Sequence, residues 1–393
     1  MSKVFSAISL QMFNRFAENL VQYRGLKPYP IEEIKGFSVE KDLHVFIKRE
    51  HDNIEGTDPI RSIKRKPASI MGLFVEEVNP YSKVWISASS GNFVEELGIL
   101  ANEAGKDLFA VVPPRTPSQK IETLRNLGIN IVKVSEEEYD LCPREFTVFW
   151  VRALVNRLNS TDVLNIDQYN SILNPLSHVL LTAKEIDEKF ENDLTHIFVP
   201  LGSTGTFAGI CEYFSRFRPK VKIIGVQPTM EHHIPGVHYV MGDCKWSPEI
   251  FGLPDKRSLK ILTIDDKSAY LALSELEVKY GVHGGPSSGM VFAALKKELN
   301  TMEDGSNILV LSADSSWDYV EWNRAILTKL KNESVFSEED DVLVEKYMGL
   351  LQRREDASRR VLKVKNTYKP PKKGQLYSLE EFEDLWPNLL NKT

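Results

Sequence analysis

The sequence predicts an α/β fold built from parallel β-α-β units. Between about residue 40 and residue 315, short β-branched runs alternate with longer segments of helical periodicity. With 393 residues, 42% hydrophobic and 26% charged, the chain has an ordinary globular composition and enough length for two or three domains. We therefore expect parallel sheets in two lobes, with a cleft between the lobes.

The alternation gives the expected elements in order. Strands are expected at residues 44–48, 83–87, 108–112, 130–134, 196–200, 222–227, 260–264 and 307–311. Helices are expected at 95–104, 117–126, 182–190, 206–217, 267–280 and 289–299. Ahead of them, an amphipathic helix is expected on Phe5, Ile8, Met12, Phe16 and Leu20.

Composition argues against several classes of protein. The net charge of −6 disfavours a chain that mainly coats nucleic acid. Cys142, Cys211 and Cys244 are odd in number and far apart, so they support neither a disulfide framework nor a cysteine zinc site, and a reducing cytoplasm fits best. No apolar run approaches the ~18 residues of a membrane span.

The last 60 residues differ from the rest. A charged helix is expected from about 338 to 360, and the stretch that ends at Gly374 is typical of a linker. Residues 352–375 hold nine Lys/Arg against two Asp/Glu. We interpret this excess as a solvated linker and helix face, with an acidic partner or nucleic acid as the alternative.

A final apolar helix is expected near the C-terminus. Ser378 and Glu381 form a capping-box pattern. An apolar stripe follows, made by Leu379, Phe382, Leu385, Trp386 and Leu389. Such a stripe needs a docking surface, which would be the chain's own core, a dimer mate, or a protein partner for residues 376–393.

Four polar segments carry the chemistry. Gly202, Ser203, Thr204, Gly205 and Thr206 lie between a strand and a helix, where backbone amides, small hydroxyls and the helix N-terminus suit an anion. Ser and Thr in such turns also simply cap helices. The other segments are 87–92 (SASSGN), 284–289 (GGPSSG) and the lysine-bearing 62–67 (SIKRKP). The sequence contains no HExxH, no GxxxxGK[ST] loop and no EF-hand loop.

The order of these segments resembles that of fold type II pyridoxal phosphate enzymes. A lysine segment, SSGN, Gln168-Tyr169-Asn170, GSTGT and PSSG follow one another as in the cysteine synthases and cystathionine β-synthases. The likeness spans roughly residues 40–320 and is closest to the archaeal O-phosphoserine sulfhydrylases. It implies a tryptophan synthase β-like fold with pyridoxal 5'-phosphate as cofactor and no metal.

The resemblance assigns roles residue by residue. Lys64 matches the lysine that holds the cofactor and moves the α-proton, as suits an amine whose pKa is lowered by neighbouring cations. Asn92 matches the ligand of the ring hydroxyl, residues 202–206 match the phosphate loop, and Ser287 matches the residue facing the pyridine nitrogen, with Ser288 as fallback. Ser89, Ser90 and Gly91 match the loop that binds the substrate carboxylate, and Gln168 matches a residue that assists this loop.

The implied reaction is β-replacement on a serine-derived amino acid (O-phosphoserine, O-acetylserine or serine). Sulfide or a thiol adds to a bound aminoacrylate and gives cysteine or a related amino acid. A neutral serine at the ring nitrogen favours this chemistry over long-lived carbanions. The alternatives are a serine/threonine dehydratase and a non-catalytic paralogue that acts through its C-terminal tail.

Departures from the family pattern bear on the substrate. Arg65-Lys66 follows the lysine where the family has an Asp-Arg-like pair, and this favours an anionic leaving group. Glu95 and Glu96 at a helix start suit the helix dipole, but in a cleft they would disfavour anionic donors. His238 stands near the position of an arginine in the phosphoserine-using relatives and is a candidate substrate contact. His232 and His233 lie beside it, either as surface residues or, less favourably, as metal ligands.

The resemblance also implies domain bounds. We expect a large cofactor-binding lobe at 1–69 plus 166–330, a smaller mobile lobe at 70–165, and a helical extension at 331–393. A homodimer is usual among such proteins.

Overall fold

A computed structural model describes residues 28–37, 41–51, 62–114, 116, 118–137, 146–240, 259–365, 370 and 372–390. The chain divides into two compact units. The larger unit comprises Met1–Ile63 and Pro175–Lys363, and the smaller unit comprises Lys64–Asn174 and Val364–Thr393. The amphipathic helix expected at residues 5–20 lies outside the described residues.

The larger unit is built on a six-stranded sheet in the order β1-β2-β10-β7-β8-β9. Only β1 runs antiparallel to its neighbour; the other pairings are parallel. The strands are β1 (Ile31–Glu33), β2 (Leu43–Arg49), β7 (Leu194–Pro200), β8 (Lys222–Pro228), β9 (Lys260–Ile264) and β10 (Ser306–Ser312).

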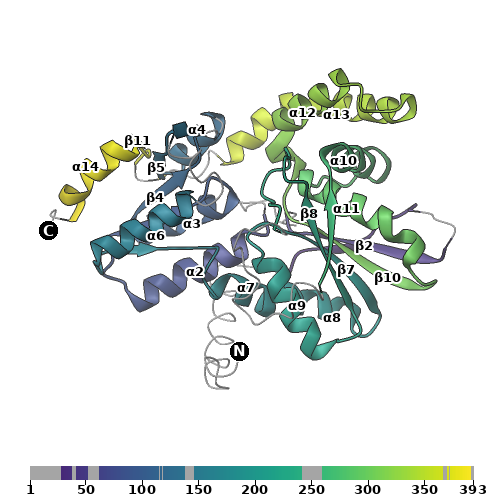
Figure 1. The fold of residues 1–393 in the computed structure, drawn as a ribbon, viewed down its shortest axis with the longest axis horizontal. Coiled ribbons are helices and arrows are strands. Elements are labelled where there is room, and N and C mark those ends of the chain that lie inside the picture. Colours follow the sequence, from purple (N-terminus) through teal and green to yellow (C-terminus); the bar gives the residue numbers. More distant parts are fainter. Residues whose placement is uncertain are drawn as a thin grey trace. The chain divides into compact units, whose positions relative to one another are not determined.

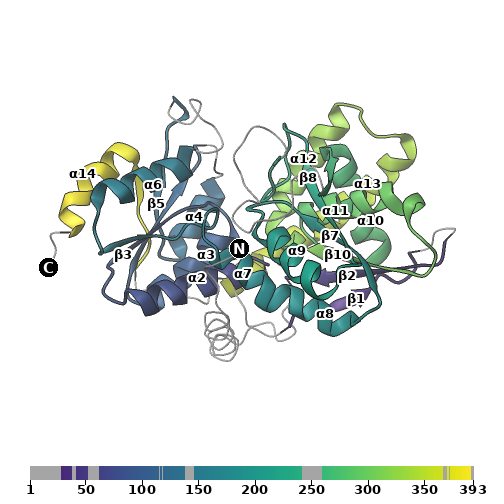
Figure 2. The same cartoon turned by 60° about the horizontal axis from the view of Figure 1, so that its bottom comes forward.

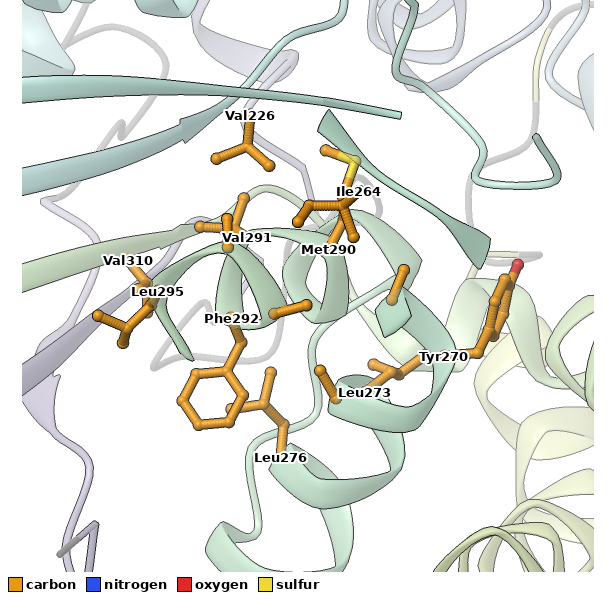
Figure 3. Close-up of a cluster of buried hydrophobic side chains, with 14 of the residues drawn as sticks. Val226, Ile264, Tyr270, Leu273, Leu276, Met290, Val291, Phe292, Leu295 and Val310 are labelled. Carbon is orange, nitrogen blue, oxygen red and sulfur yellow. The ribbon is translucent and has the colours of Figure 1, made fainter. Parts of the chain in front are cut away.

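Helices cover both faces of this sheet (Figure 1). On one face, α10 (Asp266–Tyr280) and α11 (Pro286–Glu298) build a core with every second residue of β10, including Ile308 and Val310. Figure 3 shows this core, in which Phe292, Leu273 and Leu276 pack together. On the other face, α8 (Lys184–Phe190) and α9 (Gly205–Phe217) pack on the intervening residues Leu309 and Leu311. A sheet buried on both faces explains why its strands are almost continuously apolar.

Two further helices complete the larger unit. The helix α12 (Val320–Asn332) is followed by the 28-residue α13 (Glu338–Lys365). Tyr347 of α13 is fully buried, and its hydroxyl oxygen accepts a hydrogen bond from Asn323 Nδ2 of α12 at 3.1 Å. The expected charged helix therefore exists, and part of it belongs to the core of this unit.

The smaller unit has a five-stranded parallel sheet in the order β11-β5-β4-β3-β6. Its strands are β3 (Val84–Ala88), β4 (Asp107–Val112), β5 (Asn130–Lys133), β6 (Val163–Asn165) and β11 (Leu376–Ser378). Its helices include α2 (Arg65–Val78), α3 (Asn92–Glu103), α4 (Ser118–Asn126), α6 (Phe146–Leu158) and α14 (Leu379–Leu390).

The C-terminal segment is part of this smaller unit. β11 extends the sheet beside β5, and Figure 2 shows α14 next to α6. The Phe382 ring is fully buried, with its centroid 4.9 Å from that of Phe109 and 6.0 Å from that of Trp150. Leu379 and Phe382, the part of the apolar stripe that is described as buried, thus pack within the smaller unit.

Local contacts explain how this segment is held. The capping box is present, because Ser378 N–H donates to Glu381 Oε2 at 2.8 Å and Glu381 N–H donates to Ser378 Oγ at 3.1 Å. Upstream, Lys372 pairs with Asp107 and Lys373 with Glu122. Two lysines of the stretch expected to be a free linker are therefore matched to acidic residues of the smaller unit.

The observed units differ from the bounds expected from the sequence. Residues 331–393 were expected to form one extension, whereas residues up to Lys363 group with the larger unit and those from Val364 with the smaller unit. The physical reason is that α13 buries Tyr347 on one unit while β11 pairs with the sheet of the other. In the described part of the chain, no helix is long and apolar enough to cross a membrane.

Candidate active site

The anion-binding turn predicted at Gly202–Thr206, here called the phosphate loop, lies in the larger unit between β7 and α9. Thr204 adopts a left-handed conformation with φ of 62°, and α9 begins at Gly205. A Cβ added to Gly202 would lie 2.4 Å from the backbone oxygen of Gly236, so only glycine fits there. The loop thus combines backbone amides, two threonine hydroxyls and the positive end of a 13-residue helix. This set of donors fits a phosphate group.

A buried histidine that the sequence analysis missed supports this loop. His178 Nε2 lies 3.2 Å from Thr206 Oγ1, and His178 Nδ1 lies 3.0 Å from Thr182 Oγ1. His178 opens the π-helix η1 (His178–Ala183), a geometry that is frequent at functional sites. At Gly209 of α9 an added Cβ would lie 2.7 Å from His178 Cβ, so this glycine permits the close approach.

The turn at Gly284–Gly289, here called the ring-nitrogen turn, also lies in the larger unit. Its two serines are buried at the start of α11. Ser288 Oγ lies 2.8 Å from Ser312 Oγ, which lies 3.1 Å from His51 Nε2. Among the described residues the Ser287 hydroxyl has no hydrogen-bond partner, so it is the serine whose hydroxyl is available to a ligand.

The predicted Schiff-base lysine lies at the start of the smaller unit. Lys64 directly precedes α2, and its carbonyl oxygen accepts a hydrogen bond from Ala68 N–H at 3.1 Å. Its side chain is half-buried. The lysine therefore stands at the N-terminus of a helix of the smaller unit.

The segment Ser89–Asn92, here called the carboxylate loop, follows β3 in the same unit. Its four residues are half-buried, and α3 begins at Asn92. Gly91 N–H donates to Ser89 Oγ at 3.4 Å, and a Cβ added to Gly91 would meet no atom within 4 Å. Its amides and hydroxyls suit a carboxylate, and its packing is loose.

Gln168 lies near the same edge of that sheet. It follows β6, which pairs in parallel with β3, and Ser87 Oγ donates to Ile166 O at 2.8 Å. Because the carboxyl ends of parallel strands meet at one edge, Gln168 and the carboxylate loop emerge together. Gln168 is buried, and its backbone carbonyl oxygen accepts a hydrogen bond from Asn174 Nδ2 at 2.6 Å.

The two glutamates at the start of α3 are buried and matched by partners of the smaller unit. Glu95 pairs with Lys120 of α4. Glu96 Oε1 accepts a hydrogen bond from Ser69 Oγ at 3.0 Å and lies 4.0 Å from Arg65 Nε. Each is only 1% exposed. Their negative charge is therefore balanced inside the unit, and so is part of the positive charge of Arg65.

The three clustered histidines follow β8 in the larger unit. His233 Nδ1 lies 2.7 Å from Asp266 Oδ2, and His232 Nδ1 accepts a hydrogen bond from Ile234 N–H at 3.2 Å. His238 is exposed, and its backbone N–H donates to Leu201 O at 2.8 Å, which places it beside the phosphate loop. Within the described residues no group of three or more His, Cys, Asp or Glu could hold a metal ion.

The cysteine that the structure describes is a poor candidate for chemistry. Burial raises the pKa of the Cys211 thiol to about 12, so the thiol is protonated at neutral pH. Cys142 and Cys244 lie outside the described residues.

The predicted site residues thus fall into two sets. The phosphate loop, Ser287 and His238 belong to the larger unit, whereas Lys64, Asn92, the carboxylate loop and Gln168 belong to the smaller unit. Within the larger unit, an anion-binding turn at the start of α9 and a serine hydroxyl at the start of α11 suit an α/β enzyme that binds a phosphorylated cofactor.

The comparisons with known proteins identify that cofactor. The family model described as "Pyridoxal-phosphate dependent enzyme" matches residues 23–314. The chain belongs to this family, and its cofactor is pyridoxal 5'-phosphate. The donor sets of the phosphate loop and of Ser287 fit the phosphate and the ring nitrogen of that molecule.

Among its relatives are cysteine synthases. Cysteine synthase B of Escherichia coli (strain K12) is 24% identical over 287 residues, which cover 72% of this chain and 88% of the relative. N-(2-amino-2-carboxyethyl)-L-glutamate synthase of Cupriavidus metallidurans is 26% identical over 283 residues, covering 69% of this chain and 79% of the relative. The prediction of a cysteine synthase-like enzyme is confirmed, whereas the special likeness to archaeal O-phosphoserine sulfhydrylases stays a prediction.

Solved structures confirm the fold. O-acetylserine dependent cystathionine beta-synthase from Helicobacter pylori superposes with a TM-score of 0.66 at 22% identity, covering 76% of this chain and 96% of that chain. O-ureido-L-serine synthase gives a TM-score of 0.62 at 21% identity, covering 75% and 90%. The expected fold type II architecture is therefore confirmed.

Proposed function

We propose that the chain catalyses β-replacement on a serine-derived amino acid, with sulfide or a thiol as the incoming nucleophile and cysteine or a related amino acid as the product. The observation that carries the proposal is the buried, neutral hydroxyl of Ser287 at the start of α11. A hydroxyl beside the ring nitrogen leaves the ring a weaker electron sink than a carboxylate would, which favours loss of a β-substituent.

In this proposal each cofactor contact is assigned to a residue of this chain. The phosphate loop binds the phosphate, Ser287 the ring nitrogen and Asn92 the ring hydroxyl oxygen, and Lys64 carries the covalent attachment. When bound, pyridoxal phosphate supplies the electron sink for removal of the α-proton. The Lys64 amine takes that proton.

The carboxylate loop orients the amino-acid substrate. Its half-buried hydroxyls and amides bind the carboxylate, and Gln168 supports them from the neighbouring strand. The loose packing around Gly91 lets the loop adjust when substrate binds, which would exclude water from the reacting carbon.

We propose O-acetylserine as the donor in preference to O-phosphoserine. Two observations support this choice. Arg65, which would attract an anionic leaving group, lies next to Glu96, and the exposed His238 offers a weaker anion contact than an arginine would. A structural neighbour, the cystathionine beta-synthase from Helicobacter pylori, is described as O-acetylserine dependent.

The test is product analysis with each donor. Purified protein with bound cofactor is incubated with serine, O-acetylserine or O-phosphoserine, with and without sulfide, beside the Lys64→Ala variant. We expect cysteine to form from O-acetylserine only when sulfide is present, and none to form with Lys64→Ala. Pyruvate formed without sulfide would indicate a dehydratase instead. Absence of turnover with all donors, despite bound cofactor, would favour a non-catalytic protein.

A cytoplasmic homodimer is part of the same proposal. It is supported by the family resemblance, because a homodimer is usual among such proteins, and by the cysteine content. Phe382 of the C-terminal tail packs within the smaller unit, and a protein partner for residues 376–393 remains a prediction. Light scattering of the purified protein, with twice the chain mass of 44.8 kDa expected, tests the dimer.

A further inference from the structure

Arg354 is a buried cation on a helix that lies beyond the family match, which ends at residue 314. It belongs to α13 and to the basic stretch 352–375, and its side chain is 11% exposed. Its guanidinium lies 2.7 Å from Glu277 Oε2 and 2.9 Å from His283 Nδ1, and it donates to Ser316 Oγ at 3.1 Å. Arg354 thus contacts specific residues of its own unit, although the sequence predicted a solvated helix face in this stretch.

Two of these partners flank the ring-nitrogen turn. His283 directly precedes Gly284, and its carbonyl oxygen accepts a hydrogen bond from Ser316 N–H at 3.0 Å. Within the turn, Gly285 N–H donates a hydrogen bond to the backbone oxygen of Asp314 at 2.8 Å. The turn that carries Ser287 is therefore paired with residues 314–316, and Arg354 donates to Ser316 on one side of that pairing and shares the Glu277 carboxylate with His283 on the other.

The third partner fixes the guanidinium in place. Glu277 of α10 is fully buried, and its Oε2 also lies 2.8 Å from His283 Nδ1. Burial alone would raise the pKa of Glu277, but the hydrogen bonds of His283 and Arg354 hold that pKa below its ordinary value. The carboxylate is thus ionised, and Trp317 covers the guanidinium with its ring centroid 5.0 Å away.

We propose that Arg354 is a positioning residue for the cofactor: through Ser316 directly, and through Glu277 to His283, it holds the ring-nitrogen turn so that Ser287 meets the pyridine ring. The inference rests on the proposed role of Ser287. It assigns a function to α13, which would then serve the cofactor site as well as the core.

The experiment measures cofactor binding rather than turnover. The apoproteins of wild type, Arg354→Met, Arg354→Lys and Arg353→Met are titrated with pyridoxal phosphate, and their melting temperatures are recorded with and without cofactor. Arg353 is the matched control, because it carries the same charge on the same helix but is exposed and contacts only the Gly349 carbonyl among the described residues. A Ser287→Ala background is titrated in parallel.

We expect the Kd for pyridoxal phosphate to rise about tenfold in Arg354→Met, less in Arg354→Lys, and not at all in Arg353→Met. In the Ser287→Ala background, Arg354→Met should add less than twofold, because the two residues act through one contact. The visible absorption maximum of the bound cofactor should shift in Arg354→Met as in Ser287→Ala.

A Kd within twofold of wild type in Arg354→Met, with equal loss of melting temperature in apo and cofactor-bound protein, would overturn the inference. If Arg354→Met does not fold, an unchanged Kd in Arg354→Lys would overturn it instead. Failure of the proposed function looks different, since wild type itself would then bind no cofactor or form no product.

Discussion

The phosphate loop and the carboxylate loop follow parallel strands in the same way but are held very differently. The phosphate loop has Gly202 against Gly236, and Thr206 bonded to the buried His178. The carboxylate loop has a long hydrogen bond from Gly91 N–H to Ser89 Oγ, and open space around Gly91. The difference matches their proposed ligands, because a resident cofactor benefits from a rigid site whereas a substrate must enter and leave.

The largest difference between the two loops is expected when one glycine in each loop is replaced by alanine. Gly202→Ala places a carbon 2.4 Å from a backbone oxygen, so we expect a loss of stability of about 2 kcal/mol and a fall in cofactor affinity of about a hundredfold. Gly91→Ala meets open space and should change stability by less than about 0.5 kcal/mol.

Calorimetry and cofactor titration of the two variants decide the matter. Equal effects in both glycine variants would mean that the loops are equally rigid, and the comparison would fail.

A second change asks whether the carboxylate loop is loose because its whole unit is weakly folded. Phe382 is fully buried against Phe109 and Trp150, so Phe382→Ala should destabilise the smaller unit by about 3 kcal/mol or more. Hydrogen exchange in β4 and β5 would report the loss, with the exposed Phe149→Ala as control. A negligible effect would show that the C-terminal segment contributes little to this unit.

In the larger unit, we expect the ionised Glu277 to stabilise the fold in a pH-dependent way. Because the folded pKa of Glu277 is depressed, its contribution to stability is present above its unfolded pKa of about 4.5 and is lost as pH falls through the folded value. Glu277→Gln should be less stable than wild type by about 3 kcal/mol at pH 7, and this gap should narrow below about pH 4.5. Denaturant unfolding at several pH values measures it; a gap independent of pH would contradict the ionised pair.

The smallest effects are expected for two variants that distinguish cofactor binding from substrate binding. His178→Ala leaves Thr206 without its imidazole partner and should raise the cofactor Kd about tenfold. Ser89→Ala should leave cofactor affinity unchanged and raise the KM of the amino-acid donor about tenfold. Cofactor titration and steady-state kinetics of both variants test this prediction. An effect of Ser89→Ala on cofactor affinity would contradict the assignment of the carboxylate loop to the substrate alone.

Much of the fold could be predicted from local sequence. The eight expected strands are present, with bounds shifted by at most two residues, because buried parallel strands leave continuous apolar runs. The three-residue strands β1, β6 and β11 were missed, because such short pairings depend on neighbours distant in the chain. The segment of η1 was missed because the helical pattern was recognised only from Thr182 onward.

The candidate site was predictable where it lies in contiguous motifs. Lys64, Asn92, the phosphate loop and Ser287 each follow a strand or open a helix, and their order along the chain gave the family. His178 and Arg354 had no such signal. They reach their partners 28 and 71 residues away, and isolated polar residues on helices are ordinarily surface or core residues.

The most direct measurement locates the covalent bond to the cofactor. The purified protein with bound pyridoxal phosphate is reduced with borohydride, digested, and its peptides are mapped by mass spectrometry. The account predicts the cofactor on Lys64 alone. Modification of another lysine, such as the nearby Lys66, or of no lysine at all, would show that this helix start is not the catalytic centre.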